Sequence, residues 1–109
     1  MRRVILESPF AGNLWQRWLN RRYARKCMRD SLLRGESPLL SHLLYTQALD
    51  DAVPHERGLG IEAGLAWGPA AHATIVYTDR GITRGMRLGI ERAVSQGRPV
   101  FYRALSPST

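Results

Sequence analysis

Two polar turns, each placed after an apolar run, carry the side chains of this sequence that are best suited to chemistry. The first covers residues 8–13 and follows "RVILE", and the second covers residues 78–86 and follows "ATIVY". In an open sheet of parallel strands, ligands bind beyond the carboxyl ends of the strands. We therefore expect both turns to lie at the same edge of one sheet.

The second turn has the residue types of an anion site. Thr83 is placed to cap a following helix, whose first N–H groups attract negative charge. Gly85 lets a ligand approach the backbone, and Arg84 adds a charged donor. A capped glycine turn without any ligand explains the same residues, and neither a P-loop nor a dinucleotide-binding fingerprint is present.

The first turn also has two interpretations, a ligand site or a turn with a structural role alone. Ser8 and the backbone of residues 10–12 are placed to hold a polar group, and the ring of Phe10 is placed to stack on a base or a sugar. A simple strand-to-helix turn, with Asn13 as the helix cap, is the alternative.

The titratable side chains suggest a carboxylate that acts as a nucleophile or stabilises an oxocarbenium ion in glycosyl chemistry, more than a metal site. Of the three histidines only His42 falls at a strand end, and no histidine pair has the spacing of a zinc site, so we expect neither a metal nor a cofactor. Asp79 at a strand exit and Glu91 on a helix are the candidate catalytic carboxylates, whereas we interpret Glu62 as a surface residue.

Strand and helix patterns alternate along the chain. We predict strands at 3–7, 38–45, 73–78 and 98–103, and helices at 13–34, 56–68 and 83–96. This order predicts an α/β fold: a small flavodoxin-like, doubly wound sheet of four parallel strands with helices on both faces. The length of 109 residues favours a single domain over 1–109.

Charge is unevenly distributed. The net charge of +7 resides in residues 1–34, and the rest of the chain is balanced. Such a block is typical of nucleic-acid binding, of a helix face exposed to solvent, or of attraction for a phosphate ligand. The residues that would contact nucleic acid are Arg17, Arg21, Arg22, Arg25, Lys26 and Arg29.

Other features bear on location and assembly. No apolar run reaches the length of a membrane span and no signal peptide is evident, so a cytoplasmic location without membrane contact is expected. Cys27 is interpreted as a buried thiol. On the first helix, Trp15, Leu19, Tyr23 and Cys27 recur every four residues, with Trp18, Met28 and Leu32 widening the stripe. The tryptophans, including Trp67, would serve as core or interface anchors, and we expect a homo-oligomer.

Several motifs together resemble a known group. "VILESPFAGN", "NRRYA", "PLLSHLLY", "PHERGLGIEAGLAW" and "TDRGITRGMRLGIERAVSQGRPVFYR" resemble a branch of small phage and bacterial domains of unassigned function. That branch is similar to the nucleoside 2-deoxyribosyltransferases and to proteins that cleave nucleotide N-glycosidic bonds. The resemblance implies a nucleoside or nucleotide pocket at the strand ends, formed by Ser8, Pro9, Phe10, Gly12, Asn20, Tyr23, Ser41, His42, Arg57, Asp79, Thr83, Gly85 and Met86. Arg84 joins these candidate ligand-binding residues through its place in the second turn.

One position departs from the pattern of the transferases. The resemblance implies a catalytic glutamate four residues after Gly85, and this position is Gly89 here. Glu91 lies about 200° further around a helix and does not replace it.

Three functions follow from the sequence. The first is binding, or sequestration, of a nucleotide-derived or ADP-ribose-like molecule, in the host cytoplasm if the protein is phage-encoded. The second is an N-glycosidase or deoxyribosyltransferase that uses Asp79 or Glu91. The third is a nucleic-acid-binding module.

Overall fold

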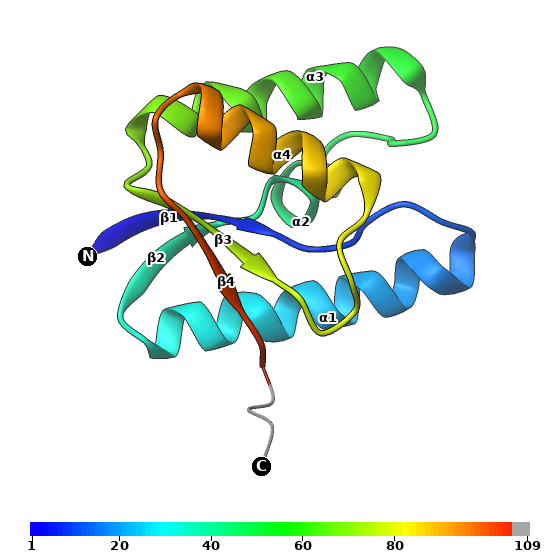
Figure 1. Ribbon diagram of the computed structural model, residues 1–109. Coiled ribbons are helices and arrows are strands. Elements are labelled where there is room, and N and C mark those ends of the chain that lie inside the picture. The colour runs from blue at the N-terminus through cyan, green and yellow to red at the C-terminus, as the bar shows by residue number, and fades with distance from the viewer. Residues whose placement is uncertain (106–109) are drawn as a thin grey trace.

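The computed structural model describes residues 1–105, and these form one four-stranded sheet between helices (Figure 1). The strands β1 (Arg2–Glu7), β2 (Glu36–Leu39), β3 (Ala73–Tyr77) and β4 (Val100–Arg103) are all parallel, in the order β2-β1-β3-β4. Helix α1 (Leu14–Leu33) covers one face, whereas α3 (Pro54–Ala66) and α4 (Arg84–Ser95) lie on the other. The predicted fold class is confirmed.

The core lies where β1 and β3, the two central strands, meet α1. All five residues of β3 are buried, as expected of a strand covered on both faces. In β1 the side chains alternate, because successive residues of a strand point to opposite faces. Val4 and Leu6 pack in the core beneath α1, which places Glu7 on the face of α3 and α4.

The helix starts follow from local capping. Asn13 accepts a hydrogen bond from the N–H of Gln16 at 2.9 Å, and the Gln16 side chain accepts one from the N–H of Asn13, which starts α1 with a complete capping box. Thr83 caps α4 in the same way through the N–H of Met86. Both caps are those that the sequence predicts.

The second predicted strand is only partly correct. The chain is extended over Glu36–Leu39, but Ser41–Leu44 forms a short helix, α2, followed by the 3₁₀ turn η1 (Tyr45–Gln47). An apolar run of this length fits a strand or a buried helical turn equally well. The tertiary structure decides, because α2 lies against α3.

The boundaries of the remaining elements differ little from the prediction. Helix α3 begins at Pro54, two residues earlier than predicted, and is followed by the 3₁₀ turn η2 (Gly68–Ala70). The predicted strands at 73–78 and 98–103 and helix at 83–96 are each shorter by one or two residues at an end.

The apolar stripe predicted on α1 is wrong at its ends. The buried residues of this helix are Asn20, Tyr23, Ala24, Cys27 and Ser31. Trp15 and Trp18 stack on each other at the surface, with ring centroids 5.2 Å apart, and Leu32 is half exposed. The buried face includes polar residues because they bond to β2 and to the turn before α1, which periodicity of apolar residues does not reveal.

The tryptophans lie outside the core. Trp15, Trp18 and Trp67 are all exposed, and the indole N–H of Trp67 donates to Tyr45 at 2.8 Å. On α4, Met86 and Ala93 are buried, whereas Val94 is exposed. The interface role of the tryptophans, and with it a homo-oligomer, stays a prediction.

Gly64 allows α3 to approach α2 closely. A Cβ at this position would lie 2.7 Å from the Cβ of Ser41 and 2.9 Å from its hydroxyl oxygen. Gly64→Ala should therefore lower the free energy of unfolding by about 1–3 kcal/mol, measured by urea titration. Gly58→Ala is the matched control on the same helix, because nothing lies within 4 Å of its added methyl group. Equal stability of the two variants would contradict the close packing.

Candidate functional site

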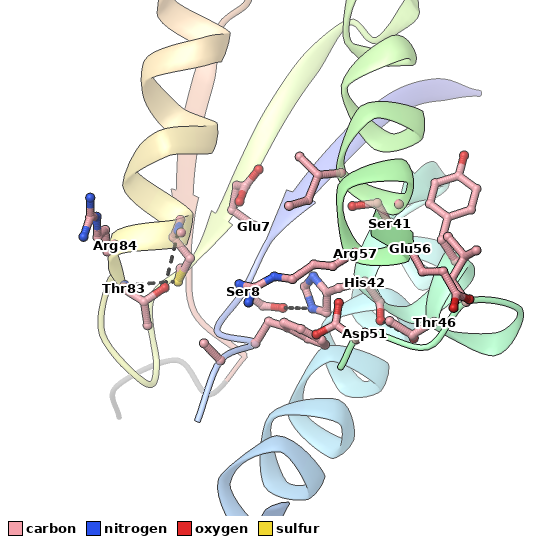
Figure 2. A pocket seen from close by; sticks show the side chains of 18 residues that line it. Glu7, Ser8, Ser41, His42, Thr46, Asp51, Glu56, Arg57, Thr83 and Arg84 are labelled. Atoms are coloured by element: carbon pink, nitrogen blue, oxygen red, sulfur yellow. Dashed lines mark hydrogen bonds between the residues drawn. The ribbon is translucent and has the colours of Figure 1, made fainter. Parts of the chain in front are cut away.

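A cleft lies at the carboxyl edge of the sheet, between α2, α3 and the start of α4 (Figure 2). It has a volume of ≈ 320 Å³, within the usual range for a small-molecule site. Several residues predicted to bind ligand line it: Ser8, Phe10, Ser41, His42, Arg57, Thr83, Arg84, Gly85 and Met86. The two turns therefore converge as expected from parallel strands.

The other predicted site residues lie outside this cleft. Tyr23 donates from its hydroxyl to Asp79 at 2.6 Å, and the carboxylate of Asp79 also accepts from the N–H of Leu105. Asn20 donates to the carbonyl of Ala11, an arrangement that holds the first turn against α1. The lining of the cleft also leaves out Pro9, Gly12 and Glu91, the last of which is exposed on α4. Tyr23 and Asn20 thus support the loops around the site.

One wall of the cleft is aromatic and neutral. The rings of Phe10 and His42 lie 5.0 Å apart, and the His42 Nε2 is 3.3 Å from the Ser8 hydroxyl. Burial lowers the pKa of His42 to about 4, so this imidazole is uncharged near neutral pH. The wall therefore offers stacking surface and a neutral hydrogen-bonding pair.

Only one of the two arginines that line the cleft points across it. Figure 2 shows Arg57 reaching from α3 across the cleft toward Ser8, whereas Arg84 points to the outer side of α4. The N-terminus of α4 faces the cleft through Thr83 and Gly85. Arg57 and this helix end are thus the groups placed to attract an anion inside the cleft.

Three carboxyl groups in the cleft were not singled out from the sequence: Glu7, Asp51 and Glu56. Asp51 lies 3.7 Å from the guanidinium of Arg17, and Glu56 accepts from the N–H of Asp50 at 3.0 Å. Glu7 is the last residue of β1. The sequence could have pointed to Glu7, because a residue that directly follows a buried apolar run lies at the carboxyl edge of the sheet.

The carboxyl group of Glu7 fills the space that a side chain at position 89 would occupy. A Cβ added to Gly89 would fall 2.6 Å from the Glu7 Oε1 and closer still to its Oε2. The sequence resemblance implies a glutamate at this place on α4 in the transferases. The carboxyl group present here comes instead from β1.

Burial acts strongly on Glu7. Loss of solvent raises the pKa of its carboxyl to about 8, although the charge of Arg98 works in the opposite direction. Arg98 itself is buried and donates to Thr74, Gly68 and Gln96 at 2.6–2.9 Å. Glu7 is therefore mostly protonated at pH 7.

Comparison with known proteins places the chain in a family. Residues 2–103 match the sequence model of a domain of unknown function, DUF7768. The chain belongs to this family. A search of curated proteins found no significant match.

A solved structure shares the fold. It is a 2-deoxyribosyltransferase from the psychrotolerant bacterium Bacillus psychrosaccharolyticus, with a TM-score of 0.68 and 16% sequence identity over 98% of this chain and 75% of that one. At this identity the similarity concerns the fold alone. The DUF7768 chain thus has the fold of a 2-deoxyribosyltransferase, as the motifs in its sequence led us to expect.

Two further features of the described residues bear on the sequence predictions. Within residues 1–105, no helix is both long and apolar enough to cross a membrane, and no group of three metal-binding side chains gathers. The basic residues Arg21, Arg22 and Arg25 line a second hollow beside Trp18, and Thr46 lines both this hollow and the cleft. Nucleic-acid binding by this face stays a prediction.

Proposed function

We propose that the cleft binds a nucleotide-derived or ADP-ribose-like small molecule. The observation that carries this proposal is the reach of Arg57 across the cleft, opposite the N-terminus of α4. A guanidinium and a helix N-terminus that converge on one space favour a phosphate group between them.

The remaining walls suit the other parts of such a ligand. Phe10 and His42 provide a face on which a base can stack, and Leu49 and Ile61 add apolar surface. Ser8 and Ser41 offer hydroxyl groups that can bond to a sugar. Asp51 and Glu56 repel a bound anion less than two carboxylates without partners would. Asp51 pairs with Arg17, and Glu56 accepts a hydrogen bond from the N–H of Asp50.

Thermal unfolding tests the proposal directly. Nucleosides, nucleoside 5′-monophosphates, cyclic nucleotides and ADP-ribose are added in turn, and a ligand present at 100 times its Kd should stabilise the fold by about 2.7 kcal/mol. If no member of the panel raises the melting temperature, the proposal is wrong.

Arg57 should decide the preference for phosphate. Arg57→Gln is expected to weaken binding of the best phosphorylated ligand by roughly 10-fold or more, because a charge-assisted hydrogen bond is lost. Binding of the matching unphosphorylated nucleoside should change little. Arg29→Gln, an exposed position on α1, removes the same charge at a distance and serves as the control. Calorimetric titration measures both; equal losses in the two variants would exclude a phosphate contact at Arg57.

Cleavage of an N-glycosidic bond is a second candidate function. The specific observation in its favour is a carboxyl group, that of Glu7, inside the cleft. Cleavage of glycosidic bonds relies on carboxyl groups that act as acid, base or nucleophile. Release of free base from a bound nucleoside or nucleotide, followed by chromatography, tests this function.

A further inference from the structure

Glu7 lies in the cleft, and the charge of Arg98 acts on it only without direct contact. Among residues 1–105 no hydrogen bond or ion pair engages its carboxyl, since Arg98 donates to Thr74, Gly68 and Gln96 instead. The oxygens of the Glu7 carboxyl still reach the open space of the cleft. In the described chain no side-chain oxygen is both fully enclosed and unpaired, so an unpaired carboxyl such as this one keeps some contact with that space. A half-buried carboxyl without a hydrogen-bond partner costs free energy, and groups of this kind are common at functional sites.

The Glu7 carboxyl has space next to α4 because residue 89 of that helix is a glycine. A Cβ at position 89 overlaps the Glu7 carboxyl where it now lies, so any larger residue there requires that carboxyl to move. Glycine within a helix costs about 1 kcal/mol relative to alanine. The structure therefore accepts an unfavourable residue on α4 at the point where Glu7 needs space.

We propose that Glu7 is the catalytic general acid of this cleft and that it protonates the leaving base of an N-ribosyl or N-deoxyribosyl substrate. This inference rests on the proposed function, because it requires a nucleoside or nucleotide in the cleft. It assigns the reacting carboxyl to β1 in place of the two candidates named from the sequence.

The step balances without another reagent. The Glu7 carboxyl gives its proton to a nitrogen of the base as the bond between that base and the sugar C1′ breaks, and the bonding electron pair stays with the base. The oxygen of a water molecule forms the new bond to C1′. The proton that this water loses returns to the Glu7 carboxylate. The products are the free base and the free sugar or sugar phosphate.

The other carboxyl groups are less suited to the role. Asp79 accepts hydrogen bonds from Tyr23 and Leu105 outside the cleft, and Glu91 is exposed. Asp51 and Glu56 are each engaged by a neighbour, Asp51 by the guanidinium of Arg17 and Glu56 by the N–H of Asp50. Glu7, with a pKa of about 8, carries a transferable proton at neutral pH.

The test measures release of base by the full chain. Purine and pyrimidine nucleosides and their 5′-monophosphates are incubated with the protein, and free base is separated by chromatography. Glu7→Gln keeps the size of the side chain but has no proton to give, so the rate should fall by about 100-fold or more. Ligand-induced stabilisation should persist in this variant, which separates loss of chemistry from loss of the pocket.

Two further variants sharpen the result. Gly89→Ala keeps the acid but displaces it, and it should also lose most of the activity. Glu62→Gln, an exposed acid on α3 outside the cleft, should leave the rate unchanged. The wild-type rate should decline above about pH 8, where Glu7 loses its proton.

The outcomes distinguish this inference from the proposed function. If ligands stabilise the protein but no base is released, or if Glu7→Gln or Gly89→Ala keeps the full rate, the role of Glu7 is wrong and the binding function stands. A rate that is constant from pH 7 to well above pH 8 would also overturn that role. If no ligand binds and no base is released, both proposals fail.

Discussion

Replacing Arg103 with methionine should lower the free energy of unfolding by about 3–4 kcal/mol. Arg103 at the end of β4 donates two hydrogen bonds to Glu36 at the start of β2, at 2.8 and 2.9 Å. Both side chains are largely buried, with 17% and 12% of their surfaces exposed. Removal of the arginine leaves a buried carboxylate without its charge partner, which costs far more than the loss of a surface pair.

Other side chains bonded to Glu36 and Arg103 should increase the loss of stability when Arg103 is replaced. Ser31 on α1 donates to Glu36 at 2.7 Å, and Arg103 also donates to the hydroxyl of Tyr77, which in turn donates to Asp30. The network therefore joins β2, β3 and β4 to the last turns of α1. Loss of Arg103 should weaken the packing of α1 as well as one ion pair.

A matched control is available at Arg34, the residue that directly follows α1. Arg34 forms an exposed pair with Asp30 at 2.9 Å, and Arg34→Met should cost no more than about 0.5 kcal/mol. Urea titration followed by circular dichroism measures both variants. Similar losses in the two would show that the burial of the Arg103 pair does not matter.

The pH dependence of this pair has a definite sign. Hydrogen bonds from Arg103 are the main reason that the pKa of Glu36 falls to about 2 from an ordinary value of 4.5. A lowered carboxyl pKa stabilises the fold above the unfolded value, so this contribution is present above pH 4.5 and disappears as the pH falls toward 2.

Glu7→Gln should stabilise the protein at alkaline pH. The pKa of Glu7 is raised to about 8 in the fold, chiefly by burial, whereas the unfolded chain loses this proton near pH 4.5. The unfolded state therefore binds fewer protons between these values, and stability falls as the pH rises from 4.5 to 8. Glutamine carries no charge to bury, so the variant should gain on the order of 3 kcal/mol at pH 8.5 and little at pH 4.

Thermal unfolding at pH 4, 6 and 8.5 measures this effect. Glu62→Gln is the control, because the exposed acid on α3 should show no such dependence. A Glu7→Gln variant that is no more stable than the wild type at pH 8.5 would mean that the carboxyl is solvated in the folded protein. A variant that is more stable but inactive would support a functional reason for this buried acid.

The sequence by itself determined the layout of the molecule. The buried run of β3, the helix caps at Asn13 and Thr83, and the alternation of strands with helices depend on neighbouring residues, so local patterns reveal them. Parallel strands place their carboxyl ends at one edge, and the sequence therefore predicts that the turns at Ser8 and at Thr83 lie together.

Only the tertiary structure decided which side chains face the cleft. The helix at Ser41–Leu44 replaces part of a predicted strand because α3 packs against it, and Asp79 faces Tyr23 instead of the cleft. Of the acids that do line the cleft, Glu7 is next to Gly89, which lies far along the chain. Desolvation and steric fit arise from contacts between distant segments, and for that reason no local pattern in the sequence could supply them.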